Sequence, residues 1–317
     1  MKPFKKIYVL GAGAVGCFFG GILARAGLDV TLIARPDRAQ AINEFGLELD
    51  CKTFYDVVHL KASSDISLLA DADLVLLSVK SPDTEPVVRS IDSILPSHSV
   101  ILSLQNGVAN VPIAKTLITN SVYPAVVYVA AGMNGHRTVK HHGRGELVIG
   151  SIDAMTDQDS KILVAISQLF TEARIPCSIA QDIKKQMWLK FLVNCAYNGI
   201  SAIGHVSYGD MVSVQEVEAL IDKITKEFLL IASMEGIDIS GLEAKEANEL
   251  IAKTMTTQIS STAQDLARGK KTEIEFLNGY IVELGKRYGI DTPFNFSVYA
   301  MVKMLESKVL RVGTSVT

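Results

Sequence analysis

A glycine-rich turn near the start constrains the fold of this 317-residue chain more than any other feature. Residues 11–16 read GAGAVG, which matches the GxGxxG pattern, and they stand between a β-rich run at 6–10 and a helix-compatible run at 15–25. A second β-rich run follows at 29–34, so the sequence predicts a βαβ unit. In such a unit the first glycine allows a tight turn, the second lets a pyrophosphate approach the backbone, and the third permits close packing of helix on strand.

The helix that opens at this turn supplies unpaired N–H donors and the positive end of a helix dipole, both of which favour phosphates. The alternative is a glycine-rich turn that binds no ligand, and the strand before it and the helix after it argue against that alternative. We therefore predict that the turn binds a dinucleotide, with cofactor contacts from Gly11, Ala12, Gly13, Ala14, Val15 and Gly16.

The end of the second β-rich run indicates which dinucleotide binds. NAD sites place a carboxylate there, on the ribose hydroxyls. This chain instead has Arg35, with Arg38 nearby, and no acidic residue stands between the end of that run and Asp37. Because a guanidinium fork suits a 2′-phosphate, the sequence favours NADPH. An arginine that is merely solvated in a loop is the alternative.

The remaining pattern divides the chain into an α/β part and a helical part. Apolar runs at 73–79 and 99–103 are bounded by polar turn residues, as in parallel strands buried on both faces, and weaker β signals follow at 123–130 and 146–149. After about residue 180 the β-rich runs end and helical spacing begins. The predicted fold is α/β, with an NADP-binding Rossmann domain at residues 1–180 and an all-helical, substrate-binding C-terminal domain at 181–317.

Five helices are expected in the second domain, separated by glycine and proline breaks. They span residues 183–198, 214–235, 243–267, 273–288 and 294–308, with Ser213 as the expected N-cap of the second. The sequence does not determine the oligomeric state, although this helical half could support a homodimer.

A polar stripe marks the first of these helices. Lys190, Asn194 and Asn198 stand at i, i+4 and i+8, which places them on one helix face among almost wholly apolar neighbours. Such a stripe either lines a wet cavity and finds partners there or is the solvated face of a half-exposed helix. Reduction of a ketone needs a proton donor beside the carbonyl oxygen, and a lysine whose pKa is lowered by desolvation can supply it. Lys190 is therefore the candidate general acid, and the two amides are candidates to orient a substrate.

A second polar cluster is ambiguous on its own. It comprises Ser260 and Ser261 and the stretch KTEIEFLNG at 271–279. A Thr-x-Glu pattern can simply mark a helix start, and serines in a polar helix are usually solvated.

Composition and the remaining residues exclude several functional classes. The net charge of −3 arises from 31 basic and 34 acidic residues without long blocks of one sign, so no nucleic-acid partner is expected. Four widely spaced cysteines form no CxxC pair, which favours a reducing, cytoplasmic compartment over disulfides or a thiolate metal site. The six histidines lack metal-ligand spacing, and the pair at His141 and His142 is expected in a loop, so no metal is predicted.

The N-terminal residues invite comparison with a targeting or membrane segment. A basic start at 1–6 precedes an apolar run at 7–24, but five glycines weaken that run as a membrane helix. Another strand, rather than a cleavage site, follows it. We therefore expect neither a signal peptide nor a membrane span.

In order and at compatible spacing, these motifs resemble the ketopantoate reductase family along nearly the whole chain. The stretch around Lys190 is the distinctive one, and the others are specific only as a series. The shared stretches are the glycine turn with Arg35, SVK at 78–80, QNG at 105–107, WLK at 188–190 with the two asparagines, the serines at 260–261, KTEIE at 271–275, NG at 278–279, GI at 289–290 and PFN at 293–295.

The resemblance implies a reaction and a set of site residues. The reaction is hydride transfer from NADPH to the C2 ketone of 2-dehydropantoate, which gives (R)-pantoate on the route to coenzyme A, with Lys190 as the general acid. The implied substrate-binding residues are Asn106, Asn194, Asn198 and Ser261. Those that position the cofactor are Lys80, Asn106, Ala131 and Glu273.

Three departures from the family pattern bear on the substrate. Ala109 stands where the family often has a second glycine, Gly199 replaces a proline that commonly follows the second asparagine, and Tyr208 replaces an expected asparagine or small polar group that helps bind substrate. A bulky phenol could change which acyl group fits. Two alternatives therefore stay open, namely an NADPH-dependent reductase of another branched 2-oxo acid or of an imine, and a non-catalytic NADPH-binding regulator.

Overall fold

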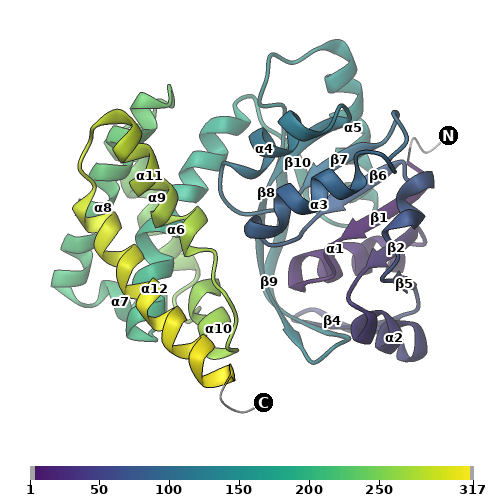
Figure 1. Ribbon diagram of the computed structural model, residues 1–317, viewed down its shortest axis with the longest axis horizontal. Helices are drawn as coiled ribbons and strands as arrows, with labels where there is room; N and C mark the ends of the chain where they lie inside the picture. Colours follow the sequence, from purple (N-terminus) through teal and green to yellow (C-terminus); the bar gives the residue numbers. More distant parts are fainter. Residues whose placement is uncertain (1–3, 315–317) are drawn as a thin grey trace. The chain divides into compact units, whose positions relative to one another are not determined.

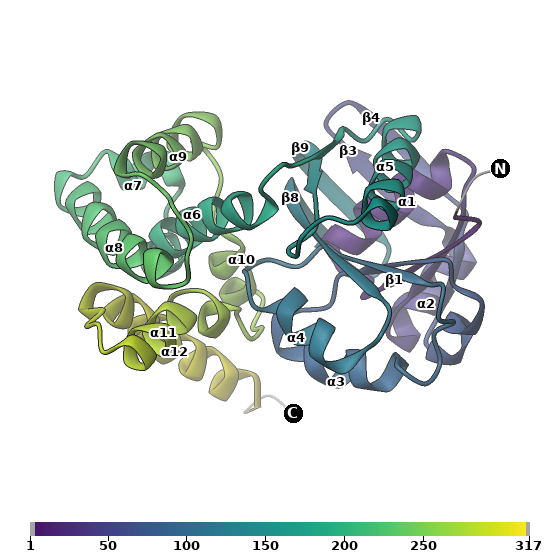
Figure 2. The ribbon, with the colours of Figure 1, turned by 90° about the horizontal axis from the view of Figure 1, so that it is seen from above.

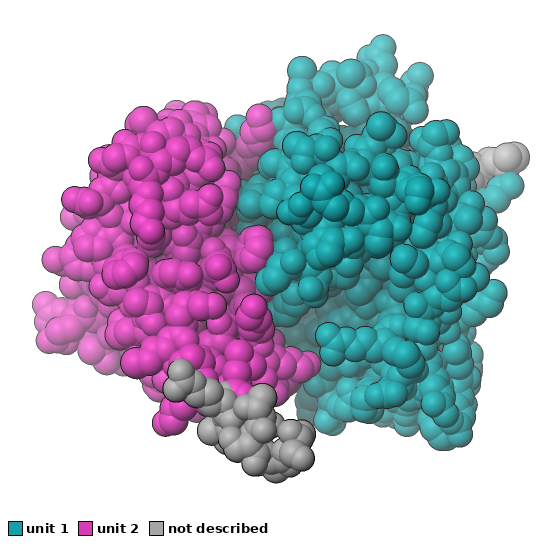
Figure 3. Space-filling view, in the orientation of Figure 1, with its two compact units in different colours: residues 1–183 teal, residues 184–317 magenta. Residues whose placement is uncertain are grey.

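The computed structural model describes residues 4–314, so the first three residues of the basic N-terminal run lie outside it. Contacts divide the chain into two compact units, Met1–Ile183 and Lys184–Thr317. Figure 1 colours the chain along its sequence, and Figure 3 gives each unit its own colour. The first unit is built on a mixed, largely parallel sheet, and helices form the described part of the second. The predicted α/β class, with a Rossmann domain before a helical region, is confirmed.

The sheet of the first unit has the strand order β4-β3-β9-β8-β7-β6-β1-β2-β5, and β10 pairs with β9. Around β1 the strands are parallel, with Leu10 paired to Ile33 of β2 on one side and to Leu77 of β6 on the other. The order therefore reverses at β1, and the carboxyl ends beside it form the switch point at which doubly wound sheets bind ligands. The strands are β1 (Lys6–Leu10), β2 (Asp29–Ile33), β3 (Leu47–Cys51), β4 (Phe54–Val58), β5 (Lys61–Ser63), β6 (Leu74–Leu77), β7 (Val100–Ser103), β8 (Ser121–Asn134), β9 (Thr138–Ile149) and β10 (Cys177–Ile179).

Helices cover both faces of this sheet, and each face has its own apolar core. One core contains residues of α1 (Ala14–Arg25), α2 (Pro36–Phe45) and α5 (Asp157–Glu172). The other contains residues of η1 (Ile66–Asp71), α3 (Thr84–Ile91) and α4 (Asn110–Leu117). Figure 2 shows α3 and α4 on the side opposite α5. The strands between these layers are apolar on both faces, which explains why the sequence shows them as continuous runs.

The second unit is organised around the long helix α6 (Ile183–Gly204). Its apolar side carries Trp188 and Phe191, which pack edge-on with each other and with Phe228 of α8 at centroid distances of 5.2–5.6 Å. The other elements are η3 (Ile274–Phe276), α7 (Tyr208–Val212), α8 (Gln215–Met234), α9 (Gly241–Thr254), α10 (Ser261–Ala267), α11 (Asn278–Tyr288) and α12 (Pro293–Thr314).

Several elements differ from the sequence-based expectation. The strands β3, β4, β5 and β10 are not predicted because β3 and β4 mix polar with apolar residues and the other two have three residues each. His141 and His142 lie in β9 and not in a loop, since β9 already begins at Thr138. No described helix is long and apolar enough to cross a membrane.

Two helix predictions were wrong at their boundaries. The helix expected at 243–267 is two helices, because the Ser260 hydroxyl accepts a hydrogen bond from the Ala263 N–H at 3.1 Å and starts α10 as its N-cap. The N-cap of α8 is Val214 and not Ser213. The Ser213 hydroxyl instead donates to the carbonyl of Asp210, where α7 ends.

Candidate active site

The glycine turn lies at the switch point, directly after β1. Gly11 has φ +106°, and its carbonyl accepts a hydrogen bond from the Ser78 hydroxyl at 2.7 Å. A Cβ on Gly16 would lie 2.3 Å from the Gly11 carbonyl oxygen, so the close packing of α1 on β1 requires a glycine there. A Cβ on Gly13 would have nothing within 4 Å, and no side chain caps the N-terminus of α1. Open space and uncapped N–H groups therefore coincide, as a phosphate site needs.

A network of side-chain hydrogen bonds joins the loops that follow β6 and β7. Gln105 donates from Nε2 to the Val79 carbonyl at 3.0 Å, and Asn110 donates from Nδ2 to the Asn106 carbonyl at 2.7 Å. These bonds fix the segments that carry Lys80 and Asn106. Both segments lie at the carboxyl edge of the sheet, as the glycine turn does.

Two arginines follow the carboxyl end of β2. Arg35 is exposed and is the N-cap residue of α2, without a side-chain capping bond. Arg38, one turn later, lies beside the buried thiol of Cys17 on α1, the residue after the last glycine of the turn. Burial raises the pKa of Cys17 to about 11, and the charge and hydrogen bond of Arg38 oppose that rise. The Nη1 atom of Arg38 is buried and has no hydrogen-bond partner among the described residues.

Ala131 lies further along β8, beyond the part of the strand that pairs with β7. Its partner in β9 is His141, and the register of the two strands shifts between Ala130 and Ala131. The His141 ring stacks on Phe18 of α1 at a centroid distance of 4.5 Å. This contact ties the irregular part of β8 and β9 to the helix that begins at the glycine turn.

The predicted polar stripe lies on α6 in the second unit. Lys190 and Asn194 are half-buried and Asn198 is buried, so the stripe is not the solvated face of an exposed helix. Asn198 accepts a hydrogen bond at Oδ1 from the Tyr208 hydroxyl at 3.0 Å, and its carbonyl accepts one from the Ser260 hydroxyl at 2.9 Å.

The second polar cluster divides into structural and accessible residues. Ser260 is buried and caps α10, whereas Ser261 next to it is exposed. Glu273 is buried just before η3. Asn278 is fully buried and donates from Nδ2 to the Cys195 carbonyl at 2.9 Å, so it secures the middle of α6 rather than a ligand.

The predicted site residues therefore fall into two groups. The glycine turn, Arg35, Lys80, Asn106 and Ala131 belong to the first unit. Lys190, Asn194, Asn198, Ser261 and Glu273 belong to the second.

Sequence reasoning missed several polar residues that support the first group. Thr84 donates to Asn110 Oδ1 at 2.9 Å, and Asn110 donates to the Ser81 hydroxyl at 3.1 Å, all within the network around Lys80 and Asn106. Ser78 holds the glycine turn. The signal available for Ser78 was its position directly after an apolar strand, whereas Thr84 and Asn110 stand further on, at the starts of α3 and α4.

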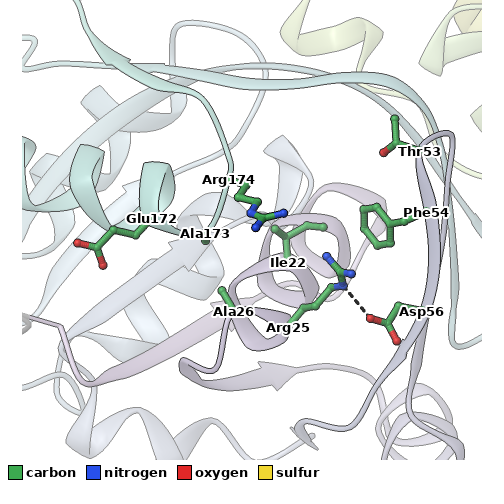
Figure 4. A pocket seen from close by; sticks show the side chains of 9 residues that line it. All are labelled: Ile22, Arg25, Ala26, Thr53, Phe54, Asp56, Glu172, Ala173 and Arg174. Atoms are coloured by element: carbon green, nitrogen blue, oxygen red, sulfur yellow. Dashed lines mark hydrogen bonds and ion pairs between the residues drawn. The ribbon is translucent and has the colours of Figure 1, made fainter.

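A cavity of about 790 Å³ lies in the first unit, away from these residues. It is lined from the end of α1 and the end of α5, and Figure 4 shows Arg25 between Phe54 and Asp56 with Arg174 opposite. The Arg25 Nε lies 2.7 Å from Asp56 Oδ2, and the guanidinium lies 4.2 Å from the centre of the Phe54 ring. The lining contains two arginines and two carboxylates, those of Asp56 and Glu172, so its formal charges cancel. The glycine turn at the opposite end of α1 is the better phosphate site.

Titratable groups show no arrangement for metal chemistry in the part of the chain that the structure describes. No group of three or more histidines, cysteines, aspartates and glutamates is placed there to hold a metal ion. The residues assembled at the glycine turn and on α6 instead suit a dinucleotide and an organic substrate.

Comparison with known families matches both units. The family model described as ketopantoate reductase PanE/ApbA matches residues 7–154, and the model of its C terminus matches residues 182–306. The 2-dehydropantoate 2-reductase of Pyrococcus horikoshii is 33% identical over 307 residues, covering 95% of this chain and 98% of the relative. The enzyme of the same name from Vibrio cholerae is 29% identical over 301 residues, covering 95% and 97%.

Solved structures also match along nearly the whole chain. A PanE/ApbA family ketopantoate reductase from Ralstonia eutropha JMP134 is 43% identical, has a TM-score of 0.89 and covers 96% of this chain and 99% of its own. D-mandelate dehydrogenase, solved with NADH and anilino(oxo)acetate, is 25% identical, also with a TM-score of 0.89 and with 96% and 99% coverage.

Proposed function

The chain belongs to the ketopantoate reductase PanE/ApbA family and is an oxidoreductase of the 2-dehydropantoate 2-reductase type, and on this premise we propose that it reduces 2-dehydropantoate to (R)-pantoate with NADPH. The observation that carries the proposal is the coincidence of two features, namely the open, uncapped glycine turn of the first unit and the half-buried Lys190 among the amides of α6. One supplies a place for a dinucleotide and the other a proton donor.

The residues around the turn fit a nicotinamide dinucleotide. Open space at Gly13 admits a pyrophosphate, and the N–H groups at the start of α1 can donate to it. NADPH is proposed over NADH because Arg35 and Arg38 follow β2, and because the buried Nη1 of Arg38 lacks an acceptor. A buried donor without a partner costs roughly 1–3 kcal/mol, and a 2′-phosphate could satisfy it.

The proposed chemistry divides between cofactor and protein. Bound NADPH supplies the hydride. Lys190 holds a proton at Nζ for the ketone oxygen, which gains negative charge as the C2 carbon is reduced. Asn194, Asn198 and Ser261 bind the 2-oxo acid, while Lys80, Asn106, Ala131 and Glu273 position the cofactor, with Asn106 also toward the substrate.

The test is a lysine exchange with a matched control on the same helix. Lys190→Ala should lower kcat with 2-dehydropantoate by about a hundredfold or more, with the Kd for NADPH unchanged, because only the proton donor is lost. Lys184→Ala removes an exposed lysine one to two turns earlier in α6 and should behave as the wild type. A Lys190→Ala enzyme with wild-type kcat would refute the role of Lys190.

A second candidate substrate class is favoured by two observations. Tyr208 is a bulky phenol where the family pattern has a smaller polar residue, and D-mandelate dehydrogenase, which shares the fold, was solved with an aromatic 2-oxo acid analogue. A panel of 2-oxo acids with branched and aromatic side chains decides between the two classes. Higher kcat/KM with phenylglyoxylate than with 2-dehydropantoate would transfer the assignment to aromatic substrates.

Two further properties are proposed with this function. We propose a homodimer, which is supported by exposed apolar side chains on the helices of the second unit, among them Leu230, Met234 and Met304. Light scattering at micromolar concentration tests it.

We also propose a cytoplasmic location, supported by four cysteines that are all free thiols.

A further inference from the structure

A tyrosine holds one of the asparagines proposed to bind the substrate. The Tyr208 hydroxyl lies 3.0 Å from Asn198 Oδ1, and both side chains are buried. A buried phenol O–H needs an acceptor, and Oδ1 is the one that the described structure offers. Burial raises the pKa of the Tyr208 phenol, so its proton stays on the oxygen. The amide of Asn198 is therefore turned with its oxygen toward Tyr208.

The nitrogen end of the same amide is open. Asn198 Nδ2 has no hydrogen-bond partner among the side chains that the structure describes, those of residues 4–310, and it is not completely shielded from solvent. An amide nitrogen donates hydrogen bonds and does not accept them. Asn198 thus presents the donors of Nδ2, and the group that binds at this end of the amide must be an acceptor, such as a carboxylate or ketone oxygen.

Tyr208 is held in place independently of Asn198. Its backbone N–H donates to the Gln258 carbonyl at 3.0 Å, and the next residue, Gly209, donates to the Thr256 carbonyl at 2.8 Å. Its ring packs edge-on against Tyr197 at a centroid distance of 5.4 Å. These contacts hold the phenol in place, so the orientation of the Asn198 amide follows from the position of the Tyr208 hydroxyl.

Asn194 and Ser261 differ from Asn198 because no other described side chain orients them. Within the described part of the chain, neither side chain has a hydrogen-bond partner, and Asn194 is half-buried while Ser261 is exposed. An amide with both ends open and a hydroxyl can each donate and accept. These two residues suit a group that does both, such as a hydroxyl on the side chain of the substrate.

We propose that Tyr208 is a positioning residue, which orients the Asn198 amide so that its Nδ2 donates hydrogen bonds to the 2-oxo acid end of the substrate. Asn194 and Ser261 then recognise the variable side chain of the substrate. This inference rests on the proposed function. It assigns Asn198 to the atoms that all 2-oxo acids share.

The test measures KM and kcat for Tyr208→Phe with two substrates, 2-dehydropantoate and 3-methyl-2-oxobutanoate, which lacks the hydroxyl. Without the phenol hydroxyl the amide can rotate, so KM for both acids should rise about tenfold, equivalent to roughly 1.4 kcal/mol, while kcat changes less than about threefold. KM for NADPH should not change. The control is Tyr197→Phe, which removes a neighbouring hydroxyl that donates to the Asn248 carbonyl, and its KM values should equal those of the wild type.

A second variant keeps the test decisive if Tyr208→Phe folds poorly. Asn198→Asp retains an acceptor for Tyr208 but removes the donors and opposes the substrate carboxylate with a negative charge, so KM for both acids should rise about a hundredfold or more. Unchanged KM values in both variants of an active enzyme would overturn the role of Tyr208 and Asn198. A wild-type enzyme that reduces neither acid would overturn the proposed function instead.

Discussion

Individual glycines of one turn are required for different physical reasons. Gly16 has no room for a side chain, since an added Cβ would lie 2.3 Å from the Gly11 carbonyl oxygen and 2.4 Å from the Ser78 hydroxyl oxygen. Gly13 has room, with nothing within 4 Å of such an atom, and its backbone does not need a positive φ. The structure of the protein alone therefore explains Gly16 but not Gly13. A ligand that approaches the backbone explains Gly13.

This difference predicts opposite behaviour of two alanine variants. Gly16→Ala should lower the free energy of unfolding by about 1–3 kcal/mol, the usual cost of forcing a methyl group into a packed site. Gly13→Ala should leave that free energy within about 0.5 kcal/mol of the wild type and raise the Kd for NADPH at least tenfold, because the methyl fills the space left for the pyrophosphate. Urea titration and fluorescence titration with NADPH measure the two quantities. Wild-type NADPH affinity in Gly13→Ala would show that the dinucleotide does not bind at this turn.

At the scale of elements, the sequence predicts the strands and helices whose formation depends on a local pattern of residues. The continuous apolar runs of β1, β6 and β7 are recognisable because these strands are buried between two helical layers. The edge strand β4, half-exposed and mixed in composition, carries no such signal. The break between α9 and α10 escapes notice because it depends on Ser260 capping a helix while also bonding to the carbonyl of Asn198, a long-range contact.

In the candidate site too, some residues are identified by local sequence pattern and others only by tertiary contacts. Motif spacing identifies Lys190 and its amides, because residues four apart share a helix face. The bond from Tyr208 to Asn198 depends on how α7 packs on α6, and the network of Gln105 and Asn110 depends on two loops that follow different strands. Such contacts are properties of tertiary structure.

The start of α9 yields a prediction about pH. Glu243 and Ser240 form a capping box, and Lys185 of α6 places its Nζ 2.6 Å from Glu243 Oε1. The ion pair with Lys185 and the two hydrogen bonds from Ser240 lower the pKa of Glu243 to about 2 from the usual 4.5. Because the folded pKa lies below the unfolded one, the stabilisation is fully present above pH 4.5 and is lost as the pH falls from 4.5 toward 2.

The carboxyl resonance of Glu243 should accordingly titrate with a midpoint near pH 2 in an NMR experiment. Lys185→Gln should move the midpoint upward, toward but not to 4.5, because the bonds from Ser240 remain. Lys245→Gln, which removes a lysine that pairs with Glu249, should leave it in place. An unshifted midpoint in Lys185→Gln would mean that the ion pair does not form in solution.

At the scale of the whole molecule, the residues proposed for the cofactor phosphates all belong to the unit that carries the sheet, whereas the proton donor belongs to the helical unit. A ligand that binds only the folded state stabilises it by RT ln(1 + [L]/Kd), about 2.7 kcal/mol at a hundred times Kd. For units of this size, each kcal/mol raises the melting temperature by about 2–4 °C. The effect of a dinucleotide on melting is therefore large enough to report which groups bind it.

Calorimetry should show NADPH raising the melting temperature by about 5–10 °C at a hundred times its Kd, and NADH at the same concentration raising it much less. Arg35→Ala should reduce the NADPH shift to the size of the NADH shift and leave the NADH shift unaltered, since the guanidinium meets only the 2′-phosphate. Arg38→Ala should also reduce the NADPH shift, because the buried Nη1 of Arg38 has no acceptor among the described residues and can donate to the 2′-phosphate. Equal shifts with both dinucleotides in the wild type would mean that neither arginine contacts a 2′-phosphate and that the protein does not prefer NADPH.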